Sequence, residues 1–187
     1  MRRNWFPKPY ADVVARLRVP GGFVLVTAFL WLSNPNPESL ALGIPISLLG
    51  LLLRGWAAGH LSKDRQLAMT GPYAYVRNPL YLGTLTVAAG LVVAAQEPLL
   101  AWIFSAVFLL VYLPVIELEE QHLRKLFPEY ARYAERVPVL WPRYDAHRKK
   151  GRFRWDLYRR NQEYQALLGF LTGVAVLLWK VWGKGVV

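Results

Sequence analysis

Five long stretches of this 187-residue chain are apolar and almost uncharged, and they constrain its fold more than any other feature. Only Arg54 and Lys180 are charged within these stretches, which cover residues 19–33, 40–59, 80–96, 98–116 and 166–181. An α-helix needs about 17–25 residues to cross the hydrocarbon core of a bilayer. The remaining polar chain is too short to enclose five buried helices. The sequence therefore predicts an all-α membrane protein with about five transmembrane helices.

Composition excludes several other classes of protein. Apolar residues make up 55% of the chain, far too much for an intrinsically disordered protein. The chain has no cysteine, which excludes disulfide scaffolds, iron–sulfur clusters, thiolate zinc sites and cysteine nucleophiles. The net charge of +11 fits two classes, a membrane protein with a basic cytoplasmic rim or a nucleic-acid-binding protein.

The distribution of basic residues predicts how the chain is oriented. The connections 34–39 and 96–98 contain no Lys or Arg, whereas residues 118–165 contain twelve. Because Lys and Arg are retained in the cytoplasm, we expect a multi-pass protein with a cytoplasmic N-terminus and an external C-terminus. The polar segments before the third span and after the fourth are then cytoplasmic. Lys180 and Lys184 are exceptions to the rule.

The whole chain, residues 1–187, is expected to form one integral membrane domain. It begins with an interfacial helix over residues 1–18. Tyr10, Val13, Val14 and Leu17 follow the i, i+3, i+4, i+7 spacing of such a helix. The third and fourth spans are joined by only about three residues, which predicts a tight helical hairpin.

The C-terminal part predicts a basic cytoplasmic linker, residues 143–165, and an extra span, residues 166–182. Gly169 and Gly173 form a GxxxG pattern, which permits close packing of two helices in one chain or in a homodimer. Residues 148–160 interleave seven basic residues with Phe153, Trp155 and Tyr158. This pattern is compatible with nucleic acid, but beside a span it favours the headgroups of anionic lipids.

The first of two polar segments runs from Lys63 to Gly83. Gly71-Pro72 is a turn signal, and Asn78-Pro79 marks the start of the third span. Three tyrosines surround Arg77 in the segment. One explanation is an aromatic belt with an arginine at the cytoplasmic interface, and the other is a functional site.

The second polar segment runs from Glu117 to Pro142. Glu117, Glu119 and Glu120 lie at the end of the fourth span, and charge at membrane depth indicates function. The alternative is a solvated helix end. Glu119 and His122 form a single E-x-x-H, whereas di-iron bundles need two. No zinc spacing, dinucleotide fingerprint or P-loop occurs, so we predict no metal site.

Together the two segments resemble a known family. The pattern G-x-Y-x-x-x-R-[HN]-P-x-Y-x-G is followed by E-E-x-x-L, then F-x-E-Y-x-x-Y and V-P, in that order around the predicted hairpin. These positions here are Gly71, Tyr73, Arg77, Asn78, Pro79, Tyr81, Gly83, Glu119, Glu120, Leu123, Phe127, Glu129, Tyr130, Tyr133, Val137 and Pro138. The chain is similar to the isoprenylcysteine carboxyl methyltransferase family, to which phospholipid methyltransferases and membrane sterol reductases are related, over a core of residues 48–142.

The resemblance implies an integral membrane methyltransferase that uses S-adenosyl-L-methionine in a cytoplasmic pocket around the hairpin. A lipidic or prenylated acceptor would enter from the bilayer. The resemblance implies Arg77, Glu119 and Glu120 as catalytic residues. It implies cofactor contacts at Arg65, Gln66, Leu67, Ala68, Tyr73, Asn78, Leu80, Tyr81 and Glu119. Asn78 replaces a histidine of the family, and asparagine cannot become cationic.

The residue chemistry fits methyl transfer from a sulfonium, an in-line displacement that depends on positioning. Carboxylates and tyrosine faces suit a cationic cofactor. Arg77 either holds the cofactor carboxylate or positions Glu119 or Glu120. Two alternatives stay open: a sterol-reductase-like enzyme in which Lys63 and Arg65 meet the phosphate of NADPH, and a non-catalytic membrane protein that binds anionic lipid.

Overall fold

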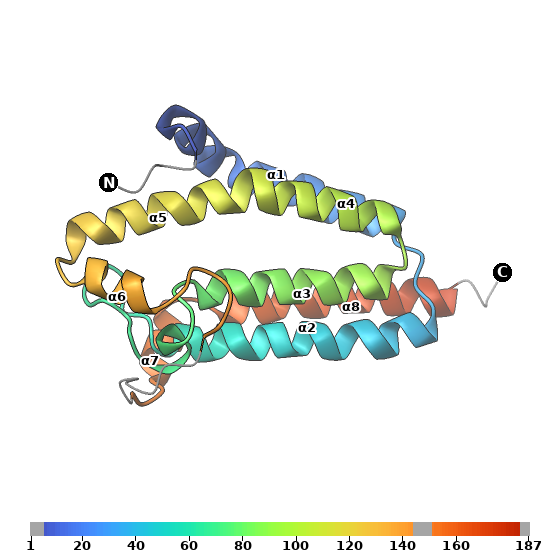
Figure 1. The fold of residues 1–187 in the computed structure, drawn as a ribbon. Coiled ribbons are helices and arrows are strands. Elements are labelled where there is room, and N and C mark those ends of the chain that lie inside the picture. The colour runs from blue at the N-terminus through green and yellow to red at the C-terminus, as the bar shows by residue number, and fades with distance from the viewer. Residues whose placement is uncertain (1–5, 144–150, 184–187) are drawn as a thin grey trace. The chain divides into compact units, whose positions relative to one another are not determined.

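The computed structural model describes residues 6–143 and 151–183, and Figure 1 shows these residues as helices joined by loops. No strand occurs within these two ranges, so the all-α prediction is confirmed. In chain order the elements are α1 (Lys8–Leu32), α2 (Pro37–Ala58), the short helix η1 (Gly71–Ala74), α3 (Pro79–Ala95), α4 (Pro98–Val107), the π-helical turn η2 (Phe108–Tyr112), α5 (Leu113–Leu126), α6 (Tyr130–Arg136), α7 (Trp155–Arg160) and α8 (Tyr164–Gly183).

Three described helices are long and apolar enough to cross a membrane: Pro37–Ala58, the run Pro98–Leu126 formed by α4 to α5, and Tyr164–Gly183. A fourth exists if Pro9–Leu17 and Gly21–Leu32, which meet at an angle of 52°, form one span. The apolar α3 has 17 residues, at the lower end of the roughly 17–25 that a span needs. The predicted count of five spans stays a prediction.

The bend in α1 follows from its sequence, since a Pro-Gly-Gly run lies at the break. Proline removes one helical hydrogen bond and glycine weakens the helix, so a kink there has a local cause. The part of α1 before the break coincides with the predicted interfacial helix, although residues 1–5 lie outside the described chain.

The chain divides into two compact units, which we describe separately. The first contains residues 1–47, 88–120 and 171–187, and the second contains residues 48–87 and 121–170. The long helices α2, α3, α5 and α8 each contribute residues to both units.

In the first unit, α2 and α3 approach closely through small residues. A Cβ atom on Gly43 would lie 2.6 Å from the backbone nitrogen of Ala94, and one on Gly90 would collide with Ser47. The Ser39 hydroxyl donates to the Ala94 carbonyl across the same contact, at 2.9 Å. Leu40, Ala94 and Leu177 form the buried centre beside this contact. Small residues therefore allow the two backbones to meet, as in many membrane helix pairs.

Lys180, an exception to the predicted charge asymmetry, has a structural role in this unit. Its ammonium group donates to the Ser33 carbonyl at 2.9 Å, to the Ser33 hydroxyl at 3.0 Å and to the Trp31 carbonyl at 3.3 Å. These carbonyls lie at the C-terminal end of α1, where backbone acceptors lack helical partners and the helix dipole favours a cation.

We predict that Gly90→Ala destabilises the protein, whereas Gly173→Ala does not. Alanine in a helix is otherwise favoured over glycine by roughly 0.5–1 kcal/mol, so only the steric conflict of Gly90 with α2 reverses the sign. A Cβ on Gly173 would meet no described atom within 4 Å. Thermal midpoints of both variants in detergent test this. A Gly90→Ala midpoint equal to or above the wild type would contradict the observed packing.

Candidate functional site

The second unit joins the two motif segments that lie more than fifty residues apart in sequence. Tyr130, Tyr133, Ala134 and Val137 of the second motif form one buried cluster with Leu67. The Tyr133 hydroxyl donates to the Tyr73 carbonyl of η1, at 2.7 Å and away from solvent. Sequence reasoning placed these motifs in one site, and α6 with its flanking residues makes the contact.

Arg77 is the charged residue at the centre of this contact. Its side chain is only 6% exposed, and its Nη1 donates to the Ala134 carbonyl near the end of α6, at 2.8 Å. Its backbone nitrogen donates to the Pro138 carbonyl at 2.8 Å. A cation beside the last carbonyls of a helix is favourable, so Arg77 also helps to hold α6 against the loop before α3.

Asn78 is buried next to Arg77 and continues the same pairing. Both its backbone nitrogen and its side-chain amide donate to the Val139 carbonyl, at 3.2 Å and 3.3 Å. The side-chain amide of asparagine always offers this donor, whereas in a neutral histidine the tautomer decides which ring nitrogen carries the proton. Val139 follows the V-P of the second motif, so these hydrogen bonds join the two motifs.

The two motif glycines are required by their surroundings. Gly71 has φ of 59°, which disfavours a side chain, and a Cβ there would lie 2.7 Å from the His60 ring. A Cβ on Gly83 would lie 2.8 Å from the Gly50 carbonyl and 2.5 Å from Cγ of Arg54. Gly83 therefore lets α3 pack on α2 beside a charged side chain.

The predicted cofactor residues of the second unit differ in accessibility. Leu67, Tyr73 and Asn78 are buried, Ala68, Leu80 and Tyr81 are half-buried, and Arg65 and Gln66 are exposed. They all lie in the loop after α2, in η1 or at the start of α3. Their contact with a cofactor stays a prediction.

The predicted acidic residues lie on α5 in the first unit. Glu119 is exposed and Glu120 is half-buried. Glu117 accepts a hydrogen bond from the backbone nitrogen of Phe6 at 3.1 Å, which gives this carboxylate a structural partner. Whether Glu119 or Glu120 faces Arg77 stays a prediction.

Sequence reasoning missed an ion pair between Arg54 and Glu163. The arginine binds the carboxylate twice, with Nε–Oε1 at 2.5 Å and Nη2–Oε2 at 3.0 Å. Its Nη1 also donates to the Thr84 hydroxyl of α3. Glu163 is 7% exposed and Arg54 23%. The available signal was a lone arginine in an apolar span, which needs a partner, although sequence alone could not say that the partner follows α7.

The C-terminal segment 151–163 also packs on this unit, which the prediction of a linker did not foresee. The Asn161 amide donates to the carbonyls of Ala58 and Leu61, both at 2.9 Å, and so caps α2. The Arg154 backbone donates to the Gly59 carbonyl at 3.0 Å. Residues 144–150 of the predicted linker lie outside the described chain.

Within the described residues, no three His, Asp or Glu side chains gather as metal ligands. His122 instead pairs with Asp64, with Nε2–Oδ1 at 3.1 Å.

Comparison with known proteins identifies the class of this site. Residues 46–130 match the family model "Phospholipid methyltransferase". This segment is therefore similar to that family of integral membrane methyltransferases, and the resemblance seen in the motifs is confirmed.

Two relatives carry names that refer to metals. The chain is 33% identical over 125 residues to the cobalt-zinc-cadmium resistance protein CzcN of Cupriavidus metallidurans. It is 34% identical over 125 residues to the nickel-cobalt-cadmium resistance protein NccN of Alcaligenes xylosoxydans xylosoxydans. Each alignment covers 66% of this chain and 57% of the relative, so the match spans little more than half the length of these proteins. No solved structure matches the chain.

We predict that Glu163→Gln lowers the free energy of unfolding by about 3 kcal/mol, because a largely buried arginine loses its anionic partner. The exposed pair Arg154–Asp156 supplies a matched control. Its atoms Nη2 and Oδ2 are 2.6 Å apart, and the hydrogen bond from Arg154 lowers the pKa of Asp156. Water screens exposed pairs, so Asp156→Asn should leave the thermal midpoint unchanged. Equal shifts for both variants would contradict this account of Glu163.

Proposed function

We propose that this chain is an S-adenosylmethionine-dependent methyltransferase of the membrane that methylates a lipidic or prenylated acceptor from the cytoplasmic side. One observation carries the proposal: the motif residues Tyr73, Arg77 and Asn78 are held in fixed, buried positions by α6 and the segment after it. Methyl transfer depends mainly on positioning, so a rigid loop at the start of α3 suits it. The family match over residues 46–130 supports the same reaction class.

The available side chains fit the chemical groups of the cofactor. Arg65 and Gln66 are exposed, and Tyr81 is half-buried in the first turn of α3. A guanidinium suits a carboxylate, an amide suits the adenine edge, and a tyrosine face suits a sulfonium. In this proposal Glu119 binds the ammonium group of the cofactor. The buried Asn78 holds the loop before α3 in place through its neutral side-chain amide, which donates to the Val139 carbonyl.

When bound, S-adenosylmethionine supplies an electrophilic methyl group on its sulfonium. The residues of this chain then have three tasks: to orient that group, to exclude water and to accept a proton where the acceptor needs it. A carboxylate acceptor attacks as an anion and needs no base. An amine acceptor must first lose a proton, which Glu119 or Glu120 takes as a general base. Arg77 acts in positioning, because its Nη1 is bonded to α6.

The names of the relatives describe resistance to metals and state no reaction. A methylated membrane component would link such a role to the proposed activity indirectly. The described residues place no three-ligand metal cluster in this chain.

The sharpest test measures binding of S-adenosylhomocysteine and NADPH to detergent-purified protein by calorimetry. We expect the wild type to bind S-adenosylhomocysteine and not NADPH. Glu119→Gln should weaken that binding by roughly 10- to 100-fold, as expected for a lost charged hydrogen bond. Glu117→Gln is the matched control on the same helix, and its amide oxygen still accepts from Phe6.

Two outcomes would contradict the proposal in different ways. Unchanged affinity in Glu119→Gln would remove this residue from the cofactor site. Binding of NADPH in place of S-adenosylhomocysteine would favour the reductase, for which the exposed Lys63 and Arg65 are suited.

A further inference from the structure

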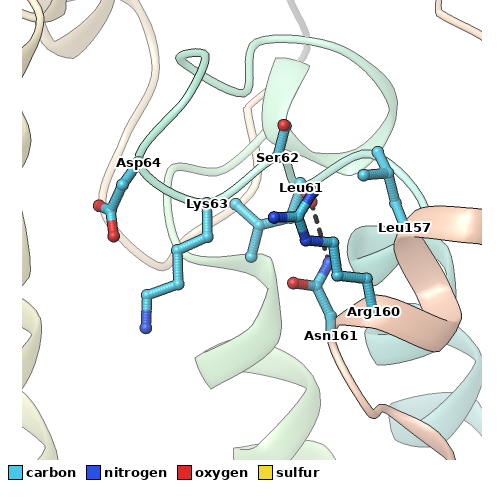
Figure 2. A pocket seen from close by; sticks show the side chains of 7 residues that line it. All are labelled: Leu61, Ser62, Lys63, Asp64, Leu157, Arg160 and Asn161. Atoms are coloured by element: carbon cyan, nitrogen blue, oxygen red, sulfur yellow. Dashed lines mark hydrogen bonds between the residues drawn. The ribbon is translucent and has the colours of Figure 1, made fainter.

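A small polar cavity lies in the second unit where the C-terminal segment packs on the loop after α2. Figure 2 shows its lining side chains, which come from that loop and from α7 with the residue after it. The cavity measures about 260 Å³ and is lined by Leu61, Ser62, Lys63, Asp64, Leu157, Arg160 and Asn161. Leu157, Arg160 and Asn161 follow position 130, where the family match ends, so the cavity extends beyond the matched segment.

The cavity is built on fixed elements. Asn161 holds its two sides together through its bonds to the carbonyls of Ala58 and Leu61, both at 2.9 Å. Leu157 is 5% exposed and anchors α7 to the loop. Arg160 lies between Leu157 and Asn161 in the sequence. Because Leu157 is buried and the Asn161 amide is hydrogen-bonded, the position of the Arg160 backbone is fixed.

The charged groups of the cavity favour an anion. Lys63 and Arg160 are exposed, and neither side chain has a hydrogen bond or ion pair with another described residue. The single carboxylate, Asp64, bonds to His122 at 3.1 Å. Figure 2 shows Asp64 on the far side of Lys63 from Arg160 and Asn161 in this view. Two cations against one engaged carboxylate leave the lining positively charged.

The surroundings indicate that the anion belongs to a lipid. The segment carrying Arg160 leads within four residues into α8, a candidate span, so the cavity lies at the end of a membrane helix. Trp155 is 68% exposed, Tyr164 43% and Trp56 44%, and exposed tryptophan and tyrosine are typical of the level of lipid headgroups. The volume is below the roughly 300–1,000 Å³ of pockets that enclose whole ligands, which suits a headgroup whose acyl chains stay outside.

We propose that this cavity binds the phosphate of an anionic phospholipid headgroup through Lys63 and Arg160. Bound lipid ties the C-terminal segment to the loop that precedes the methyltransferase motif. The proposal is independent of the methyl donor and of the acceptor.

The test compares two double variants of the full chain in detergent. Lys63→Gln with Arg160→Gln removes both cations of the cavity, whereas Lys125→Gln with Arg132→Gln removes two exposed cations elsewhere in the same unit. Binding of short-chain phosphatidylglycerol, short-chain phosphatidylcholine and inorganic phosphate is measured by native mass spectrometry and thermal shift. We expect the cavity variant to bind phosphatidylglycerol about 10- to 30-fold more weakly, because each of the two lost basic side chains contributes to the affinity for an anionic headgroup. The control variant should change this affinity less than twofold.

Four results of the lipid and phosphate measurements would overturn the proposal. These are unchanged binding in the cavity variant, an equal loss in both double variants, equal binding of phosphatidylcholine, and equal protection by inorganic phosphate, which would indicate a free anion. The double variant Lys63→Arg with Arg160→Lys keeps both positive charges and should bind phosphatidylglycerol as the wild type does. This result would show that the cavity variant loses binding because it loses charge and not because it misfolds. S-adenosylhomocysteine affinity should stay unchanged in the cavity variant. A parallel loss would assign the cavity to the cofactor site and would also overturn the proposal.

Discussion

Charged groups in a largely apolar chain must be matched by acceptors, and this requirement organises both units of the structure. Arg54 on α2 pairs with Glu163 before α8, and Arg77 before α3 donates to the end of α6. Lys180 on α8 donates to the end of α1. In each case a residue of an apolar helix, or of the segment just before one, binds a segment distant in sequence. A buried cation without such a partner is costly, so these contacts determine which segments lie together.

Much of this could be predicted from the sequence. Apolar length and charge spacing predicted helices, and two ordered motifs predicted that Tyr73, Arg77 and Asn78 belong to one site. The structure also explains why two motif positions are glycine, which the sequence pattern alone could not explain. Gly71 has a positive φ beside His60, and Gly83 packs on α2 beside Arg54.

The remainder could not be predicted because it depends on tertiary contacts without a local signal. Glu163 has ordinary neighbours in sequence, and only the fold reveals its partnership with Arg54. Asn161 resembles any polar residue of a basic segment, yet it caps α2. The basic charge of residues 143–165 predicts a cytoplasmic linker, and it carries no signal for the contacts of Arg154 and Asn161 with the end of α2. Lys180 seemed an exception to charge asymmetry because the end of α1, its acceptor, is more than 140 residues away.

The proposed function has the cluster of Tyr73, Arg77 and Asn78 support methyl transfer to a lipidic acceptor. The most direct measurement is transfer of a radiolabelled methyl group from S-adenosylmethionine into the organic extract of membranes that contain the chain. The account predicts labelled lipid that depends on the chain and is strongly reduced in Asn78→Ala. Label no higher than in membranes without the chain, with S-adenosylmethionine and a broad lipid extract both in excess, would contradict it.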